Sequence, residues 1–317
     1  MSMKTNSKKA KTKKQNINEN GEPEIRYKKK RRTLGERLSS SLFLGPSFLG
    51  VMLFFVVPFF VIIYYAGIDS IIGKNFVGMD NYKMVFENTA FRQAAKNTAT
   101  FSLISVPLSI VLSLLMAIVL EADIPLKSYF RTFFLSPLMV PVASVVLIWQ
   151  VLFDYHGVIN ELNALVGGVS VDWFKSQYSQ VVVMFLFLWK NLGYNMILFM
   201  AALATIPRDI LEVSWLDGAT PFQQFIHIKL RFITPTIFFV GIMSLINSFK
   251  VFREVYLLTG DYPYDSLYML QHFMNNTFKS LDYQKLSAAA IIMSVVMIIV
   301  IGILFIFEDK IGKDVEG

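Results

Sequence analysis

The chain has 317 residues, of which 54% are hydrophobic and 17% are charged, and its mean hydropathy is +0.51. This composition excludes disordered, collagen-like and disulfide-stabilised proteins and disfavours a soluble domain. Because the sequence contains no cysteine, thiol nucleophiles, cysteine-ligated zinc and iron–sulfur clusters are excluded as well.

The net charge of +7 is concentrated at the N-terminus. Residues 1–37 hold 13 of the 30 Lys and Arg residues and 4 of the 23 Asp and Glu residues, so residues 38–317 are slightly acidic. We expect no nucleic-acid partner, since the positive excess is confined to this tail. The tail has too little apolar content to fold alone and is predicted to be a disordered, basic cytoplasmic segment. Its role is open between contact with anionic lipid, worth ~1 kcal/mol per basic residue near the surface, and a solvated topology signal.

Six apolar segments are long enough to cross a bilayer, whose core requires about 20 apolar residues of helix. They cover residues 43–67, 98–120, 132–153, 181–205, 236–258 and 286–307. No long alternation of polar and apolar residues competes with helix in these segments. The sequence therefore predicts an all-α, multi-pass membrane protein in which residues 38–317 form one six-span domain. In the third span, Pro137 and Pro141 predict a kink, because proline lacks a backbone N–H.

The distribution of Lys and Arg between the connecting segments predicts the orientation. With the N-terminus in the cytoplasm, 20 basic residues lie inside, 7 lie outside and 3 lie within spans. Both termini are therefore expected in the cytoplasm. Without the tail, seven basic residues lie inside and seven lie outside. The predicted orientation therefore depends on the basic run from Arg26 to Arg37, next to the first span.

The segment between the fourth and fifth spans, residues 206–235, carries more local structure signals than a simple connection needs. Pro207 suits the first turn of a helix, and Gly218 suits its end. Thr220 and Gln223 match a capping box that begins a second short helix. The segment is therefore predicted to form a helical hairpin facing the cytoplasm. Its apolar side chains fit either a docking surface for a cytoplasmic partner or a hairpin folded against its own spans.

Eight residues of this segment carry a resemblance to a known family. They are Glu212, Asp217, Gly218, Ala219, Phe225, Ile228, Leu230 and Pro235. In order and spacing they resemble the E-A-A-x-x-x-G loop of permease subunits of bacterial binding-protein-dependent ABC importers, with the extension found in the carbohydrate-uptake type. The chain departs from the pattern at Val213, Ser214 and Arg231, where the family usually has two Ala and a Pro. The resemblance extends to the six-span layout and covers roughly residues 35–307.

This resemblance implies the fold of an ABC type I importer permease in a bacterial inner or plasma membrane. The hairpin would be the coupling helix that inserts into an ATPase subunit, through Glu212, Asp217, Gly218, Ala219, Phe222, Phe225 and Ile228. ATP and Mg²⁺ would be bound by those partner subunits, and no cofactor is expected in this chain. The sequence agrees, because its nearest approach to a phosphate loop, from Gly67 to Asn75, has the wrong glycine spacing and ends in Asn.

The resemblance also implies partners on and beyond the membrane. One is a second permease subunit, expected to be a different chain, so that the two form a heterodimer. Another is an extracytoplasmic solute-binding protein, which would dock on residues 68–97, 154–180 and 259–285.

Charged and amide side chains inside the fourth and fifth spans indicate a transport site, because a charge there costs ~2.5–3.5 kcal/mol and is usually directed at a cavity or a partner. Helical spacing places Lys190 and Lys250 at similar depth in the outer half of the membrane. By resemblance, the stretches WKNLGYN and NSFKVF contribute to the sugar pocket of related permeases. The candidate substrate-binding residues are Tyr194 and Asn247, followed by Lys190, Asn191, Asn195, Lys250 and Phe252. The two lysines fit an anionic sugar and snorkelling side chains equally well.

Three alternatives to a sugar pocket remain open. In the first, Lys250 pairs with Glu254, Lys190 extends outward and the amides join helices. In the second, Lys190, Lys250 and Glu254 are the acid and base of an intramembrane enzyme. In the third, the permease carries a non-sugar solute.

Catalytic and metal-binding residues are not expected in this chain. The three histidines fall on separate segments, and no G-x-S-x-G or H-E-x-x-H pattern occurs. The favoured interpretation is a non-catalytic permease subunit of an ATP-driven importer for a sugar or oligosaccharide, working by alternating access within the lipid bilayer.

Overall fold

The computed structural model describes residues 16–17, 23–24, 34–122 and 124–316, with side chains over residues 43–122 and 124–310. The chain divides into two compact units, Met1–Pro58 and Phe59–Gly317. In the first unit, strands β1 (Asn16–Ile17) and β2 (Pro23–Glu24) pair antiparallel, and helix α1 (Leu34–Val51) continues through a π-helical segment (Met52–Val56). Most of the predicted tail lies outside the described residues.

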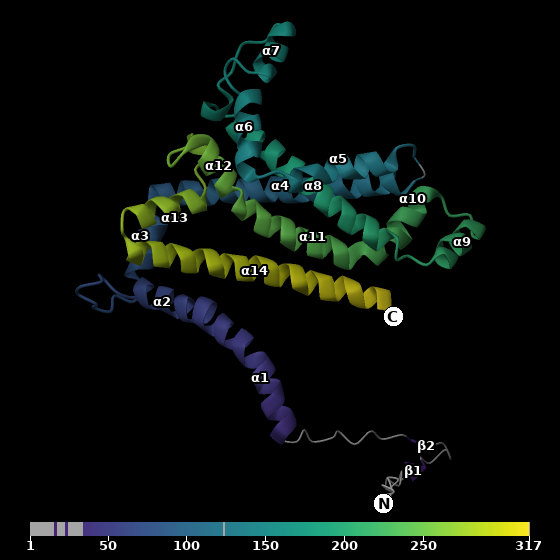
Figure 1. Cartoon of the computed structure of the whole chain (residues 1–317), viewed down its shortest axis with the longest axis horizontal. Coiled ribbons are helices and arrows are strands. Elements are labelled where there is room, and N and C mark those ends of the chain that lie inside the picture. Colours follow the sequence, from purple (N-terminus) through teal and green to yellow (C-terminus); the bar gives the residue numbers. More distant parts are fainter. Residues whose placement is uncertain (1–15, 18–22, 25–33, 123, 317) are drawn as a thin grey trace, which may run out of the picture. The chain divides into compact units, whose positions relative to one another are not determined.

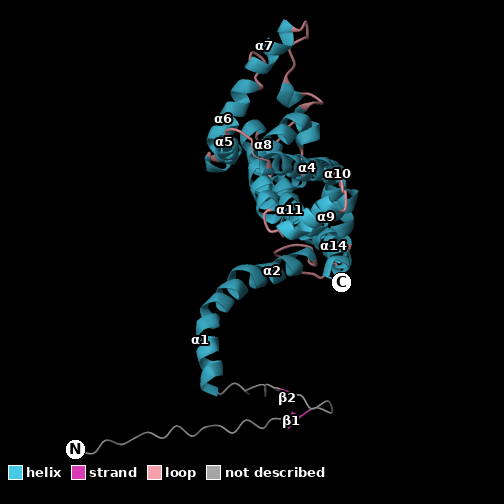
Figure 2. Ribbon diagram, turned by 90° about the vertical axis from the view of Figure 1, so that its right-hand side faces the viewer, coloured by secondary structure: helices cyan, strands magenta, loops and turns pink. Residues whose placement is uncertain are grey.

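The second unit is built from helices joined by loops (Figures 1 and 2). Helix α2 (Val57–Ala66) crosses the boundary between the units. The helices that follow are α3 (Asp80–Glu87), α4 (Thr89–Glu121), α5 (Lys127–Met139), α6 (Val142–Leu152), α7 (Val158–Leu165), α8 (Ser179–Leu203), α9 (Arg208–Leu216), α10 (Pro221–Gln224), α11 (Leu230–Lys250), α12 (Phe252–Thr259), α13 (Leu270–Lys279) and α14 (Tyr283–Glu316). A π-helical segment (Phe225–Lys229) joins α10 to α11, and 3-10 turns occur at Trp173–Lys175 and Asp265–Leu267.

Five helices in the described part of the chain are long and apolar enough to cross a membrane. They are Phe43–Ala66, Thr89–Glu121, Ser179–Leu203, Thr234–Thr259 and Tyr283–Lys310. Each overlaps one of the predicted spans, because an unbroken run of apolar residues with few charges satisfies a helix and a bilayer at once. The prediction of an all-α, multi-pass membrane protein is therefore confirmed.

The predicted third span, residues 132–153, is not a single kinked helix. It corresponds to α5 and α6, a pair that is bent by 103°. The break falls at Val140, which has φ −84° and ψ 127° and directly precedes Pro141. A proline ring disfavours helical geometry in the residue before it, so α5 ends there. Pro137 lies inside α5 without ending it, so only one of the two prolines breaks the span.

Helices α4, α8 and α11 form the centre of the second unit. Helix α4 packs on α8, and α11 packs on both, while α5 packs on α8 and α14 packs on α11 (Figure 1). The approach of α5 to α8 is close, since a Cβ atom added to Gly193 would lie 1.8 Å from the backbone oxygen of Phe134. Gly193 therefore permits a helix contact that any side chain would prevent.

The two ends of this bundle carry different elements. The short helices α9 and α10 lie at one end, and α3, α12 and α13 lie at the other (Figure 1). The central helices thus connect a hairpin at one end with a set of short helices at the other, and both ends contain predicted functional residues.

Candidate functional site

The connection between α8 and α11 forms a helical hairpin. Helix α9 ends at Leu216 with Asp217 as its C-cap, and Gly218 follows with φ +79°, a left-handed value that glycine adopts readily. Thr220 then caps α10. Its hydroxyl accepts a hydrogen bond from the backbone N–H of Gln223 at 3.3 Å, and its own backbone N–H donates to the Gln223 side chain at 2.8 Å. The predicted helix end and capping box are both confirmed.

The second helix of the hairpin is longer than the sequence indicated. Helix α10 continues through Phe225–Lys229 into α11 without a break, so one helix runs from Pro221 to Lys250. The predicted short second helix is therefore wrong. The capping residues mark where the helix starts, but Pro235, which lies inside α11, does not end it.

The hairpin exposes large apolar side chains. Trp215, Leu216 and Phe222 are 69%, 87% and 71% exposed. Of the predicted coupling residues, the exposed ones are Glu212, Asp217, Gly218 and Phe222, and the partly buried ones are Ala219, Phe225 and Ile228. Several of them line an open depression of about 320 Å³, formed by Asp217, Gly218, Ala219, Gln223, Gln224, His227 and Ile228.

Two polar residues that were not predicted hold the hairpin together. Gln224 is 6% exposed, and its Nε2 atom donates to Ser214 Oγ at 2.8 Å and to the backbone oxygen of Leu211 at 3.3 Å. These bonds fix α10 against α9. The sequence offers one signal of this contact, the polar Gln224 among the apolar residues Phe222 and Phe225. A buried amide requires hydrogen-bond partners, so Gln224 indicates a polar contact if that face is buried. The hairpin is thus folded against itself on one side and open on the other.

Polar side chains connect α4, α8, α11 and α12, and we call this set the polar seam. Its members are Ser102, Ser109, Lys190, Asn191, Asn195, Ser244, Asn247, Ser248 and Glu254. The Asn247 amide donates to Asn191 Oδ1 at 2.9 Å. The Asn195 amide donates to the hydroxyls of Ser109 at 2.9 Å and Ser244 at 3.0 Å. These bonds join helices whose polar groups have few partners in a membrane.

The seam ends in an ion pair between Lys190 of α8 and Glu254 of α12. Glu254 is 3% exposed, and its Oε1 atom also lies 3.7 Å from the guanidinium of Arg253. The structure therefore contradicts two parts of the first alternative to a sugar pocket, the pairing of Lys250 with Glu254 and the outward extension of Lys190, while the amides do join helices as that alternative expects. Although Lys250 and Glu254 are one helical turn apart, the carboxylate pairs with α8. Lys250 itself is exposed and has no ion pair or hydrogen-bond partner among the described residues.

The remaining candidate substrate residues divide into two groups. Asn191, Tyr194 and Asn247 are half-buried, so part of each side chain remains accessible. Asn195 is 1% exposed, and its amide is used within the seam. The ring of Phe252, on α12, packs beside the rings of His272 and Tyr256. The other candidates lie on α8 and α11, where Asn191 and Asn247 are hydrogen-bonded to each other.

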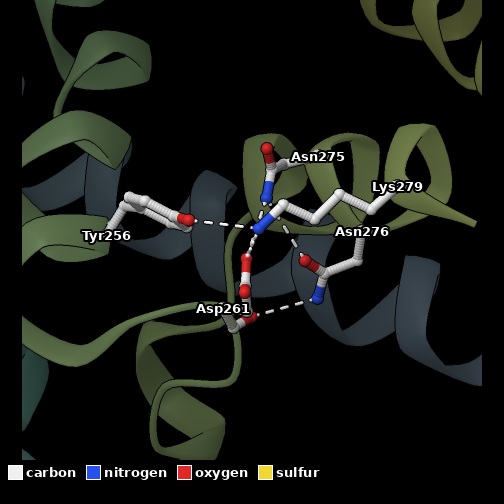
Figure 3. A network of polar contacts seen from close by, with 5 residues as sticks. All are labelled: Tyr256, Asp261, Asn275, Asn276 and Lys279. Carbon is white, nitrogen blue, oxygen red and sulfur yellow. Dashed lines mark hydrogen bonds and ion pairs between the residues drawn. The ribbon is translucent and has the colours of Figure 1, made fainter.

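A second polar cluster, which was not predicted, lies between α12 and α13 (Figure 3). Lys279 Nζ donates to Asp261 Oδ1 at 2.5 Å and to the Tyr256 hydroxyl at 3.1 Å. The side chains of Asn275 and Asn276 donate to the Asp261 carboxylate and backbone oxygen at 3.2 Å and 3.0 Å. The hydrogen bond from Lys279 keeps the pKa of Asp261 below its usual range, so this carboxylate is ionised at neutral pH. The cluster fixes the loop that follows α12 against α13.

The described histidines do not assemble a metal site. Among residues 43–122 and 124–310, no group of three or more His or carboxylate side chains is placed to hold a metal ion. His272 is fully buried, and burial lowers its pKa to about 4, so it is neutral at physiological pH. Its Nδ1 atom accepts from the backbone N–H of Met269 at 3.3 Å, which fits a packing role.

Residues 109–315 match the family described as the inner membrane component of binding-protein-dependent transport systems. The chain is 28% identical over 292 residues to the probable ABC transporter permease protein YesP of Bacillus subtilis, covering 89% of this chain and 93% of that protein. It is 30% identical over 249 residues to the multiple sugar-binding transport system permease protein MsmF of Streptococcus mutans, covering 76% and 83%. Its fold resembles that of a chain in the crystal structure of a bacterial alginate ABC transporter in complex with an alginate pentasaccharide-bound periplasmic protein, with a TM-score of 0.76, 20% identity and coverage of 89% and 99%.

Proposed function

Because this chain belongs to the family of inner membrane components of binding-protein-dependent transport systems, we propose that it is the permease subunit of an ATP-driven importer for a sugar or oligosaccharide. It is a multi-pass membrane protein and a non-catalytic transport component. ATP hydrolysis would therefore belong to partner subunits that bind ATP and Mg²⁺. Two observations support a saccharide as substrate. One relative is named as a multiple sugar-binding transport system permease protein. The amide groups of the polar seam can also exchange hydrogen bonds with sugar hydroxyls.

The observation that carries this proposal is the hairpin, with its exposed apolar and acidic side. Glu212, Asp217 and Phe222 would contact the ATPase subunit, and Gly218 provides the turn that presents them. The half-buried Ala219, Phe225 and Ile228 would support this surface from behind. Because the hairpin continues into α11, closure of the ATPase subunits would move that helix and change the side to which the pathway opens.

Substrate binding would occur where α8 meets α11. The half-buried amides of Asn191 and Asn247 and the hydroxyl of Tyr194 offer donors and acceptors to sugar hydroxyls. Lys250 would add a cationic group, Lys190 would border the site while paired with Glu254, and Phe252 would offer an aromatic ring to sugar C–H surfaces. Asn195 would position this site by holding three helices together, because its amide nitrogen donates to both Ser109 and Ser244.

The assembly would place partners on both sides of the membrane. Both termini and the tail, residues 1–37, would lie in the cytoplasm, and residues 38–317 would form the permease domain. A binding protein would dock on the outer segments 68–97, 154–180 and 259–285, the last of which the Asp261 cluster holds in shape. The complex of the alginate transporter with its periplasmic protein supports such docking. A second, different permease chain would complete the pathway.

The proposal is tested on the assembled transporter in proteoliposomes, by measuring ATP hydrolysis stimulated by a loaded binding protein across a panel of saccharides. We expect Glu212→Arg to reduce this stimulation at least tenfold, because it reverses a charge on the exposed hairpin. Gly218→Pro should do the same, since proline cannot adopt a φ of +79°.

A matched charge reversal away from the hairpin, Glu308→Arg on α14, should leave the stimulation unchanged. All three variants should insert into the membrane at normal levels. Full stimulation in Glu212→Arg and Gly218→Pro would contradict the coupling role of the hairpin. A transporter that no saccharide stimulates would contradict the proposed class of substrate.

A further inference from the structure

Charged side chains gather where α8 meets α11 and α12. Lys190, Lys250 and Arg253 are cations, and Glu254 is the one carboxylate on this stretch of the two helices. All four belong to helices that are long and apolar enough to span a membrane. A charge at such a position requires a counter-charge, a partner or a water-filled cavity. The way in which these four groups pair therefore shows which charge is left for a ligand or a partner.

The single carboxylate is already committed. Glu254 is 3% exposed, forms an ion pair with Lys190, and lies 3.7 Å from Arg253. A buried carboxylate keeps its nearest cation, because separating them leaves an unpaired charge away from water. Glu254 is therefore not available to neutralise Lys250.

Lys250 is left with an uncompensated charge. Its side chain is exposed, and it has no ion pair or hydrogen-bond partner within residues 43–122 and 124–310. Three cationic side chains and one carboxylate give this region a net positive charge. Among the described residues, the unpaired positive charge is that of Lys250, whose side chain is exposed. An accessible ammonium group within a membrane-spanning helix is usually directed at a partner or a water-filled cavity, so Lys250 is placed to bind an anion.

The neighbours of Lys250 identify the kind of anion. Asn247 lies three residues earlier on the same helix, so its side chain is about 5–6 Å away at the Cβ atoms. Asn247 bonds Asn191, and both amides, like Tyr194, remain half-buried rather than sealed in the core. Amides and a phenol bind hydroxyl groups, while an ammonium group binds an acid. A ligand that satisfies both carries hydroxyls and an anionic group on one molecule.

We propose that this permease transports an anionic saccharide, whose carboxylate, sulfonate or phosphate group pairs with Lys250 while its hydroxyls contact Asn247, Asn191 and Tyr194. This inference rests on the proposed function and adds the charge of the substrate to it. Lys190 does not supply the second charge contact, because Glu254 neutralises it. Lys250 is then a specificity-determining residue, which distinguishes an acidic saccharide from a neutral one of the same size.

The test compares each acidic saccharide with a neutral partner of matched size. Probes are oligouronides with their methyl esters, and a sulfonated and a phosphorylated sugar with the unmodified sugars. Binding is measured on the assembled transporter in nanodiscs without its binding protein, so that selection by the binding protein does not enter. We expect at least one acid to bind tenfold or more tightly than its neutral partner. Lys250→Met should abolish that difference without weakening the neutral partner, and Lys250→Arg should retain it.

Lys310→Met, which removes an exposed lysine from α14, serves as the matched control and should preserve the difference. The inference is overturned if every acid binds no better than its neutral partner, or if Lys250→Met weakens acid and neutral saccharides equally. It is also overturned if Lys250→Met releases the second permease subunit, because Lys250 would then pair with that subunit. In each of these cases saccharide-stimulated ATP hydrolysis can persist, and only its loss for all saccharides would contradict the proposed function itself.

Discussion

The buried carboxylate of Glu254 is stabilised mainly by one side chain of another helix. It is 3% exposed, and Lys190 is its ion-pair partner across the contact between α12 and α8. We expect Lys190→Met to lower the free energy of unfolding by about 3–5 kcal/mol, because it leaves the buried carboxylate with only the more distant and largely exposed guanidinium of Arg253. Adding Glu254→Gln to Lys190→Met should recover most of this loss. Thermal unfolding of the purified chain in detergent, followed by fluorescence, measures both effects.

Lys250→Met is the matched control for this prediction. It removes a lysine at similar depth, but one that is exposed and unpaired among the described residues. We expect its unfolding temperature to equal that of the unmodified chain. Equal losses in Lys190→Met and Lys250→Met, or no recovery in the double variant, would contradict the role of the ion pair.

The sequence located the charged residues of this region but not their partners. The four-residue spacing allowed Lys250 as a partner of Glu254, whereas the actual partner, Lys190, lies 64 positions away along the chain. Which face of α11 and α12 turns toward α8 is decided by the packing of α11 on α4 and of α12 on α6, and helical spacing does not contain that information. For the same reason Asn191 and Asn195, which were ranked together, differ in accessibility.

The contact between α5 and α8 depends on the absence of a side chain at Gly193. A Cβ atom there would lie 1.8 Å from the backbone oxygen of Phe134, and a backbone atom cannot turn aside as a side chain can. We expect Gly193→Ala to separate the two helices and to lower the free energy of unfolding by about 1–3 kcal/mol. Thermal unfolding in detergent and the yield of assembled transporter measure this effect.

Gly302→Ala on α14 gives the opposite case. An added Cβ atom meets nothing within 4 Å at this position, so the higher helix propensity of alanine should leave stability equal or slightly increased. If both glycine variants behaved alike, close approach of α5 and α8 would not be what Gly193 provides.

Elements were predicted best where one local signal determines them. The long apolar runs identified the spans, and Thr220 with Gln223 identified the start of a helix. Each of these signals lies in one continuous stretch of the chain and does not depend on distant residues. Of the two prolines that predicted a kink, only Pro141 lies at the break between α5 and α6, and the break is a turn of 103°, because sequence shows where a helix is weakened and not how far its halves turn. The continuity of α10 with α11 was missed because no stop signal could be distinguished from a tolerated proline.

The orientation of the whole chain depends on a short basic run. Outside the tail, the predicted inside and outside segments each carry seven basic residues. We therefore expect replacement of the Lys and Arg residues from Arg26 to Arg37 by Gln to produce chains in both orientations. Because the sequence has no cysteine, a single cysteine added after Gly317 reports the side of the C-terminus through labelling of intact cells with an impermeant maleimide.

The control replaces the six lysines from Lys4 to Lys14, which lie farther from the first span, by Gln. Charges act on orientation mainly within about 15–20 residues of a span, so this variant should remain unlabelled, like the chain with its natural tail. An unlabelled C-terminus after neutralisation of Arg26 to Arg37 would show that the body of the chain sets its own orientation.

The helix that begins at Pro221 and ends at Lys250 has a mechanical consequence. Its roughly 30 residues extend for about 45 Å, more than the thickness of a hydrocarbon core of about 30 Å. The hairpin and the polar seam therefore belong to one continuous helix, which has two irregular points, the wider π-helical turn at Phe225–Lys229 and Pro235 inside α11. Helices bend at π-helical turns and at prolines. Under the proposed coupling, a displacement of the hairpin would reach Asn247 and Lys250 only after these two points have taken up part of it.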